Sequence, residues 1–240
     1  MRSRFTLTRS MALCLALIGP AMAAVIPPGT QLHATQTMVR SNGSEPESMD
    51  PAVAETVPAN QILRDLFEGL TATTAEGKVV PGVAESWKQT NPTTWVFKLR
   101  ANAKFSNGAP ITADDFVYSF RRFVDPKTAS PYAATFGVFL LNGLEVAQGK
   151  KPTSELGVKA LDKSTLEIKT QDPVAFMLEL MTNTQFAPVH KATVEKFGKD
   201  WVKPGNMVGN GAYVFKDWQV NNRIVVEKNP QYWDAAATVL

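Results

Sequence analysis

Two hydrophobic periodicities follow each other between residues 94 and 124, and together they limit what this chain can fold into. From Thr94 to Arg100 the side chains alternate, with Trp95, Phe97 and Leu99 on one face, which is the pattern of a half-buried antiparallel strand. After Thr112 the apolar residues recur at helical spacing, which predicts an amphipathic helix. Its apolar stripe consists of Phe116, Val117, Phe120, Phe123 and Val124. Thr112 fits the cap position, with Asp115 reaching back.

The other expected elements also mix helices and strands. Helices are expected to open at Pro58 and to cover 174–181 and 192–197, the last stopped by Gly198. Short strands are expected at 37–41, 166–170, 213–215, 223–227 and 238–240. Because the two kinds of element do not alternate regularly, the fold class is α+β or mixed α/β. The strand at 238–240 has no turn or polar tail after it, which favours a chain that stops within its fold.

The first 23 residues have the three parts of a secretory signal peptide. A basic start with Arg2, Arg4 and Arg9 precedes the apolar stretch 11–18, and Ala21 and Ala23 are the small residues before a cleavage site. We therefore expect cleavage after Ala23. The alternative is an amphipathic helix. Lipid attachment at Cys14 is not favoured, because that residue lies inside the apolar stretch and follows a leucine.

Charge and cysteine content exclude several classes of function. The leader carries three of the 25 basic residues and no acidic one, so 22 basic and 22 acidic residues remain. A near-neutral chain lacks the charge that nucleic acid or an anionic membrane attracts, so neither is expected as a partner. Cys14 is the single cysteine and His33 and His190 are the two histidines, which argues against an internal disulfide framework or a metal site.

No motif predicts catalysis. The sequence holds no nucleophile elbow, phosphate loop or paired-histidine motif. Gly209 and Gly211 indicate a turn, and Asp114 and Asp115 fit the first turn of a helix. We therefore expect no catalytic residue, metal or cofactor. Tyr132 follows a serine and a proline in a loop, where an exposed ring can contact a ligand, although a place in the core is the alternative.

Seven ordered blocks carry a family resemblance. They are RDLFEGL (64–70), VPGVAESW (80–87), WVFKLR (95–100), FSNGAPITADDFVYSFRR (105–122), DPKTASPY (125–132), NGAY (210–213) and NPQYWD (229–234). In this order and spacing the chain resembles the peptide-binding family of periplasmic ABC-transporter substrate-binding proteins over essentially all of residues 24–240. The oligopeptide and murein-tripeptide branches fit better than the dipeptide and nickel branches.

The resemblance implies a two-lobed clamp that closes on its ligand by hinge motion. Lobe I would comprise residues 24–67 and 192–240, with domain II inserted between them at 68–191. Family members are roughly twice as long as this chain, and their second lobe, which would follow Leu240, is absent from it. The chain would therefore be the N-terminal portion of such a clamp.

The resemblance also implies a ligand site. The family binds an extended peptide by pairing with its backbone, and the positions implied here are Glu55, Thr56, Val57 and Tyr132. Thr56 departs from the usual glycine, so a main-chain contact there requires a negative φ. The groups that hold the peptide's two ends belong to the absent lobe.

The implied role is that of a monomeric periplasmic protein that binds oligopeptides and delivers them to the membrane permease of an ABC importer. The murein-tripeptide role is one alternative. A truncated product with little or no peptide binding is another, and a secreted peptidase is a third, although it has no catalytic motif to support it.

Overall fold

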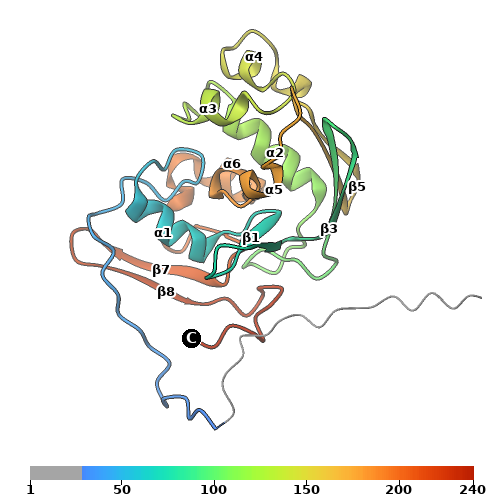
Figure 1. Ribbon diagram of the computed structural model, residues 1–240. Coiled ribbons are helices and arrows are strands. Elements are labelled where there is room, and N and C mark those ends of the chain that lie inside the picture. Colours follow the sequence, from blue (N-terminus) through green and yellow to red (C-terminus); the bar gives the residue numbers. More distant parts are fainter. Residues whose placement is uncertain (1–28) are drawn as a thin grey trace, which may run out of the picture.

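The computed structural model describes residues 29–240 (Figure 1). The expected leader 1–23 lies outside the described residues. Buried apolar side chains form two clusters, and each gathers around its own set of strands and helices.

The larger cluster lies between a four-stranded sheet and a long helix. The strands are β3 (Ala84–Asn91), β4 (Thr94–Leu99), β5 (Val158–Asp162) and β6 (Thr165–Lys169), in the antiparallel order β3-β4-β6-β5. The alternation predicted for β4 is confirmed, since Phe97 and Leu99 are buried, and β6 falls where a strand was expected.

Helix α2 (Ala113–Val124) packs its apolar stripe against this sheet (Figure 1). Its predicted start is confirmed, because the Asp115 carboxylate accepts hydrogen bonds from the Thr112 N–H at 2.8 Å and from the Thr112 hydroxyl at 2.7 Å. Short helices complete this part of the molecule. They are α3 (Ala133–Gly137), α4 (Gly143–Ala147), α5 (Met177–Leu180) and the 3-10 turns Thr153–Glu155 and Thr184–Phe186.

The smaller cluster joins the beginning and the end of the described chain. Helix α1 (Val57–Leu66) packs near the antiparallel hairpin of β7 (Tyr213–Gln219) and β8 (Arg223–Lys228), as Figure 1 shows. Helix α6 (Lys191–Phe197) ends at Gly198, whose φ of +53° confirms the predicted stop, and a 3-10 turn (Gly198–Val202) follows. Trp201 is a fully buried member of this cluster.

A small hairpin, β1 (Thr71–Thr73) and β2 (Val79–Pro81), follows α1. Close to this hairpin, residues 210–211 lie against the end of α1. The N–H groups of Asn210 and Gly211 both donate to the Leu66 carbonyl, at 3.1 and 2.8 Å. The predicted turn at 209–211 is therefore an irregular segment held against the end of α1.

Three expected elements differ in the structure. Residues 37–41 and 238–240 form no strand. A strand needs a neighbour that accepts and donates its backbone hydrogen bonds, and within the described residues neither segment has one; Val39, for example, is 94% exposed. The expected helix 174–181 shrinks to Met177–Leu180, because an apolar run reports burial and not helix length.

Candidate functional site

The structure brings Tyr132 close to the segment 55–57. Tyr132 and Glu55 are 77 positions apart in the sequence. The Tyr132 hydroxyl donates to the Glu55 carbonyl oxygen at 3.4 Å. Tyr132 lies in the turn that leads into α3, where its ring stacks on Phe136 with ring centroids 5.4 Å apart. An aromatic ring from one cluster thus borders an exposed backbone segment from the other.

Thr56 holds the conformation that its predicted role requires. Its φ is −84° and its ψ is 154°, so the backbone is extended and needs no glycine. The same residue caps α1, because the Thr56 Oγ1 accepts from the Ala59 N–H at 3.4 Å. The cap and the following Pro58 explain why the helix begins at Val57 and why residues 55 and 56 stay outside it.

Glu47 contacts this segment, and no pattern in the sequence predicts that contact. Its carboxylate accepts hydrogen bonds from the N–H groups of Glu55 and Thr56, the latter at 2.9 Å, and from the Thr56 hydroxyl. Burial raises the pKa of Glu47, whereas the hydrogen bonds from Thr56 and Glu55 lower it. The hydrogen bonds outweigh burial, so the pKa of Glu47 is below that of an ordinary glutamate. The carboxylate is therefore ionised at neutral pH.

Two backbone groups of the segment remain open. Within residues 29–240 the Val57 N–H has no hydrogen-bond partner, and the Glu55 carbonyl has only the long bond from Tyr132. Glu55, Thr56 and Val57 are all exposed. One acceptor and one donor, two residues apart on an extended segment, are what another extended chain needs in order to pair with it.

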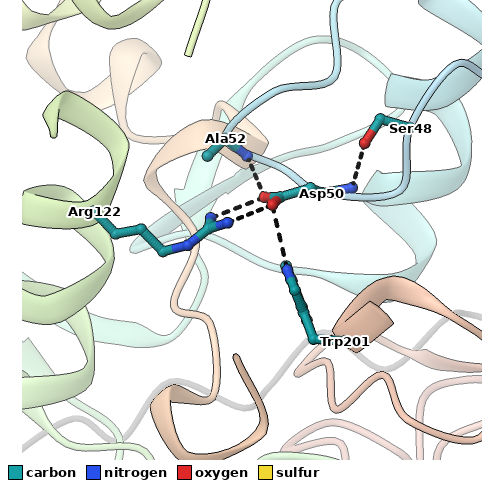
Figure 2. Close-up of polar contacts among 5 residues, drawn as sticks. All are labelled: Ser48, Asp50, Ala52, Arg122 and Trp201. Atoms are coloured by element: carbon teal, nitrogen blue, oxygen red, sulfur yellow. Dashed lines mark hydrogen bonds and ion pairs between the residues drawn. The ribbon is translucent and has the colours of Figure 1, made fainter. Parts of the chain in front are cut away.

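A buried ion pair fixes the loop that leads into this segment (Figure 2). Asp50 accepts from both terminal nitrogens of Arg122, at 2.9 Å for Nη1, from the Ala52 N–H at 3.0 Å and from Trp201 Nε1 at 3.3 Å. The Asp50 N–H in turn donates to Ser48 Oγ at 3.0 Å.

The two charged side chains are only 11% (Asp50) and 16% (Arg122) exposed. Arg122 belongs to the last turn of α2, which precedes the loop of Tyr132. The pair therefore ties the segment 55–57 to the element that positions the tyrosine. No sequence pattern singled out either residue, because an aspartate and an arginine are common and 72 positions separate them.

The remaining candidates do not assemble into a reactive centre. His33 is exposed and bonds only with nearby residues, while His190 Nδ1 lies 2.7 Å from Thr193 Oγ1 and its ring packs against Phe105. Among residues 29–240, no group of three or more His, Cys, Asp or Glu side chains is placed to hold a metal ion. In the same range, no helix is both long and apolar enough to span a membrane.

A hollow of about 580 Å³ lies along α2 and is lined by charged side chains such as Asp114, Arg121 and Lys191. It includes none of the four predicted site residues, of which Glu55, Thr56 and Val57 are exposed. A surface of this kind becomes a binding cleft when a second body covers it.

Comparison with known families decides the relationship. The sequence model of the bacterial extracellular solute-binding proteins, family 5, matches residues 78–239. The chain belongs to this family. The resemblance predicted from the seven blocks and the mixed α/β fold of a periplasmic binding protein are confirmed.

Named relatives refine this assignment. The chain is 51% identical to the periplasmic oligopeptide-binding protein OppA of Escherichia coli over 221 residues, which cover 92% of this chain and 41% of the relative. It is 47% identical to the periplasmic murein peptide-binding protein MppA of the same organism, covering 95% of this chain and 43% of that relative.

A solved structure agrees with the sequence relatives. The crystal structure of Haemophilus influenzae OppA in complex with the peptide RPPGFSPFR matches with a TM-score of 0.83 and 43% identity, over 86% of this chain and 40% of that one. The chain thus spans about two fifths of the length of the relatives that it matches, which is the coverage expected of part of a two-lobed protein.

Proposed function

We propose that this chain is the N-terminal portion of the substrate-binding component of an oligopeptide ABC importer, which binds extended peptides and delivers them to a membrane permease. The observation that carries the proposal is the meeting of Tyr132 with the Glu55 carbonyl beside an open Val57 N–H. The names of the relatives OppA and MppA support the ligand class.

Recognition in this proposal is by backbone pairing. On an extended segment, the carbonyl of one residue and the N–H of the residue two positions later lie on the same edge. An extended peptide that donates to the Glu55 carbonyl and accepts from the Val57 N–H would add a strand there, with affinity that is independent of its side chains. Thr56 would hold the segment extended, and the ring of Tyr132 would cover one side of the bound chain.

The proposed domain division follows the buried clusters. Lobe I would take 24–67 and 192–240, and most of the smaller cluster falls there, whereas the larger cluster falls almost entirely within domain II at 68–191. We further propose that the protein is monomeric and periplasmic after cleavage behind Ala23, and that it has no catalytic activity, metal, cofactor or nucleic-acid partner.

Calorimetric titration with tri- to pentapeptides and with a murein tripeptide tests this proposal. The processed chain, 24–240, should bind them at least a hundredfold more weakly than its full-length relatives do. Two missing charge-assisted contacts at the peptide's ends, at about 1.5–3 kcal/mol each, account for that factor. A submicromolar Kd for the chain would contradict this account of the site.

Substitution of the site separates specific binding from none. Tyr132→Ala should weaken whatever peptide binding remains, while Leu161→Ala, at an exposed position of β5 in the four-stranded sheet, should not. A stronger response to the murein tripeptide than to all other peptides would favour the MppA-like role. Absence of any peptide response, including in a form extended by a second lobe, would reject the import function.

A further inference from the structure

The sequence contains four Asn-Gly pairs, and an asparagine in such a pair can react with its own main chain. The pairs begin at Asn42, Asn107, Asn142 and Asn210. Attack by the glycine main-chain nitrogen on the asparagine side-chain carbonyl carbon closes a succinimide ring. Glycine favours this attack because it has no Cβ and lets the backbone turn. Hydrogen bonds that hold either group oppose it, since they must break first. The structure therefore sorts pairs of the same local chemistry by how firmly each is held.

Two of the pairs are held at both reacting groups. The side-chain oxygen and nitrogen of Asn142 and of Asn210 are all hydrogen-bonded, and the nitrogen donates at 2.8 Å in each case. The N–H groups of Gly143 and Gly211 donate to main-chain carbonyl oxygens at 2.9 and 2.8 Å. Asn210 is in addition only 1% exposed. We expect neither pair to react while the protein is folded.

Asn107 provides a matched comparison for Asn42, because each of the two is preceded by serine and followed by glycine. The Asn107 side-chain oxygen accepts a hydrogen bond from the Ala109 N–H at 3.0 Å. The Gly108 N–H donates to the Phe105 carbonyl oxygen at 2.8 Å. Both reacting groups of this pair are therefore held by hydrogen bonds of ordinary length.

Asn42 is restrained more weakly than Asn107. Its Nδ2 donates to the Pro58 carbonyl oxygen at 3.0 Å, but its Oδ1 is buried and has no hydrogen-bond partner within the described chain. A buried acceptor without a partner raises the free energy of this placement, so the side chain gains a hydrogen bond to water when it leaves. Gly43 is exposed, and the bond from its N–H to Ser41 Oγ is long, at 3.4 Å. One hydrogen bond of ordinary length thus keeps the two groups apart.

We propose that Asn42 is a site of spontaneous deamidation in the folded protein. A base in the solvent removes the Gly43 amide proton, and the nitrogen forms a bond to the Asn42 side-chain carbonyl carbon. The bond from that carbon to Nδ2 breaks, and ammonia leaves after taking up a proton from the solvent. Water then opens the ring at either carbonyl, which leaves aspartate or isoaspartate at position 42. Nothing is oxidised or reduced, and water is the co-reactant.

The modification changes the contact between the chain before α1 and the helix itself. Neither product can donate to the Pro58 carbonyl oxygen as Nδ2 does, and isoaspartate adds a carbon to the main chain. Both products are ionised at neutral pH. The pair of Arg40 with Asp65 still holds the neighbouring residues to α1, so we expect a folded protein with an added negative charge.

Peptide mapping by mass spectrometry during incubation at mildly alkaline pH tests the proposal, in native buffer and in concentrated urea. In urea the structure is lost, so Asn42 and Asn107 should react at similar rates. Each ordinary hydrogen bond that must break slows the step about fivefold. Relative to urea, folding should therefore slow Asn42 by at most about fivefold and Asn107 by at least about twenty-fivefold. Asn142 and Asn210 should stay unmodified over the same time.

Ion-exchange chromatography gives a second readout, because deamidation adds a negative charge. Asn42→Gln should abolish the acidic form that appears first, since the longer side chain closes the corresponding ring far more slowly. Asn107→Gln is the matched control and should leave that form in place.

Three results would overturn the inference. They are an Asn107 that reacts as fast as Asn42 in the folded protein, an Asn42 protected as fully as Asn210, and an acidic form that persists in Asn42→Gln. The test needs no ligand, so its outcome is separate from that of the proposed function.

Discussion

Removal of Arg122 from the buried pair should destabilise the protein more than its number of hydrogen bonds suggests. The Asp50 side chain is 11% exposed, and in Arg122→Met it loses its only cationic partner in the described chain. Breaking a buried pair costs about 3–5 kcal/mol, because one charge is left without compensation. The Ala52 N–H and Trp201 Nε1 still donate to Asp50, so we expect a loss of about 2–4 kcal/mol in the free energy of unfolding.

Urea denaturation followed by tryptophan fluorescence measures this loss, and for a protein of this size the melting temperature should fall by about 4–16 °C. The double variant Asp50→Asn with Arg122→Met should recover part of the stability, because no buried charge is left unpaired. Arg223→Met serves as the matched control. It breaks an exposed pair with Asp217, at 60% and 39% exposure, and should cost less than about 1 kcal/mol.

Two results would refute the reasoning. If Arg122→Met and Arg223→Met cost the same, the burial of the Asp50 pair does not set its energy. If the double variant loses as much free energy of unfolding as the single variants Arg122→Met and Asp50→Asn lose together, the two residues do not act as a pair. Since the loop of Asp50 leads into the segment 55–57, Arg122→Met should also weaken peptide binding.

Two further predictions concern the place where the chain crosses near α1. Burial raises the pKa of Glu68 to about 7, against hydrogen bonds from Tyr232 and Trp233 that lower it. Between pH 4.5 and 7, Glu68 therefore keeps its proton in the folded state but has lost it in the unfolded state. The free energy of unfolding should fall by up to about 3 kcal/mol as the pH rises through this window. Above pH 7 it should stay level. Urea titrations of Glu68→Gln should lack this slope, and a slope equal to that of the unmodified protein would assign it elsewhere. Gly211→Ala should cost about 1–3 kcal/mol, because the new Cβ would lie 2.5 Å from the Asp65 carbonyl oxygen; an unfolding free energy unchanged within 0.5 kcal/mol would show that this backbone contact yields easily.

Local periodicity predicted the elements whose partners are close in sequence or whose pattern is strong. β4 and α2 match because alternation and the helical stripe are both set by a single buried face. The hairpin of β7 and β8 also matches, since Asn221 takes the positive φ of 58° that its turn requires. The strands expected at 37–41 and 238–240 do not form, because pairing is decided by distant segments that periodicity does not report.

The candidate site escaped prediction from residue patterns for a related reason. Each of its parts belongs to a different apolar cluster, with 55–57 beside the smaller and Tyr132 packed on the larger. A periodic pattern reports how one cluster is built, and it carries no information on how two clusters meet. The pair of Asp50 and Arg122 joins the loop before 55–57 to α2, and a contact between two residues 72 positions apart leaves no repeat in the sequence. Glu55, Thr56 and Val57 therefore came from the family resemblance alone, while Tyr132 was also indicated by its place in a loop after Ser130 and Pro131, and the structure adds the neighbours that hold them in place.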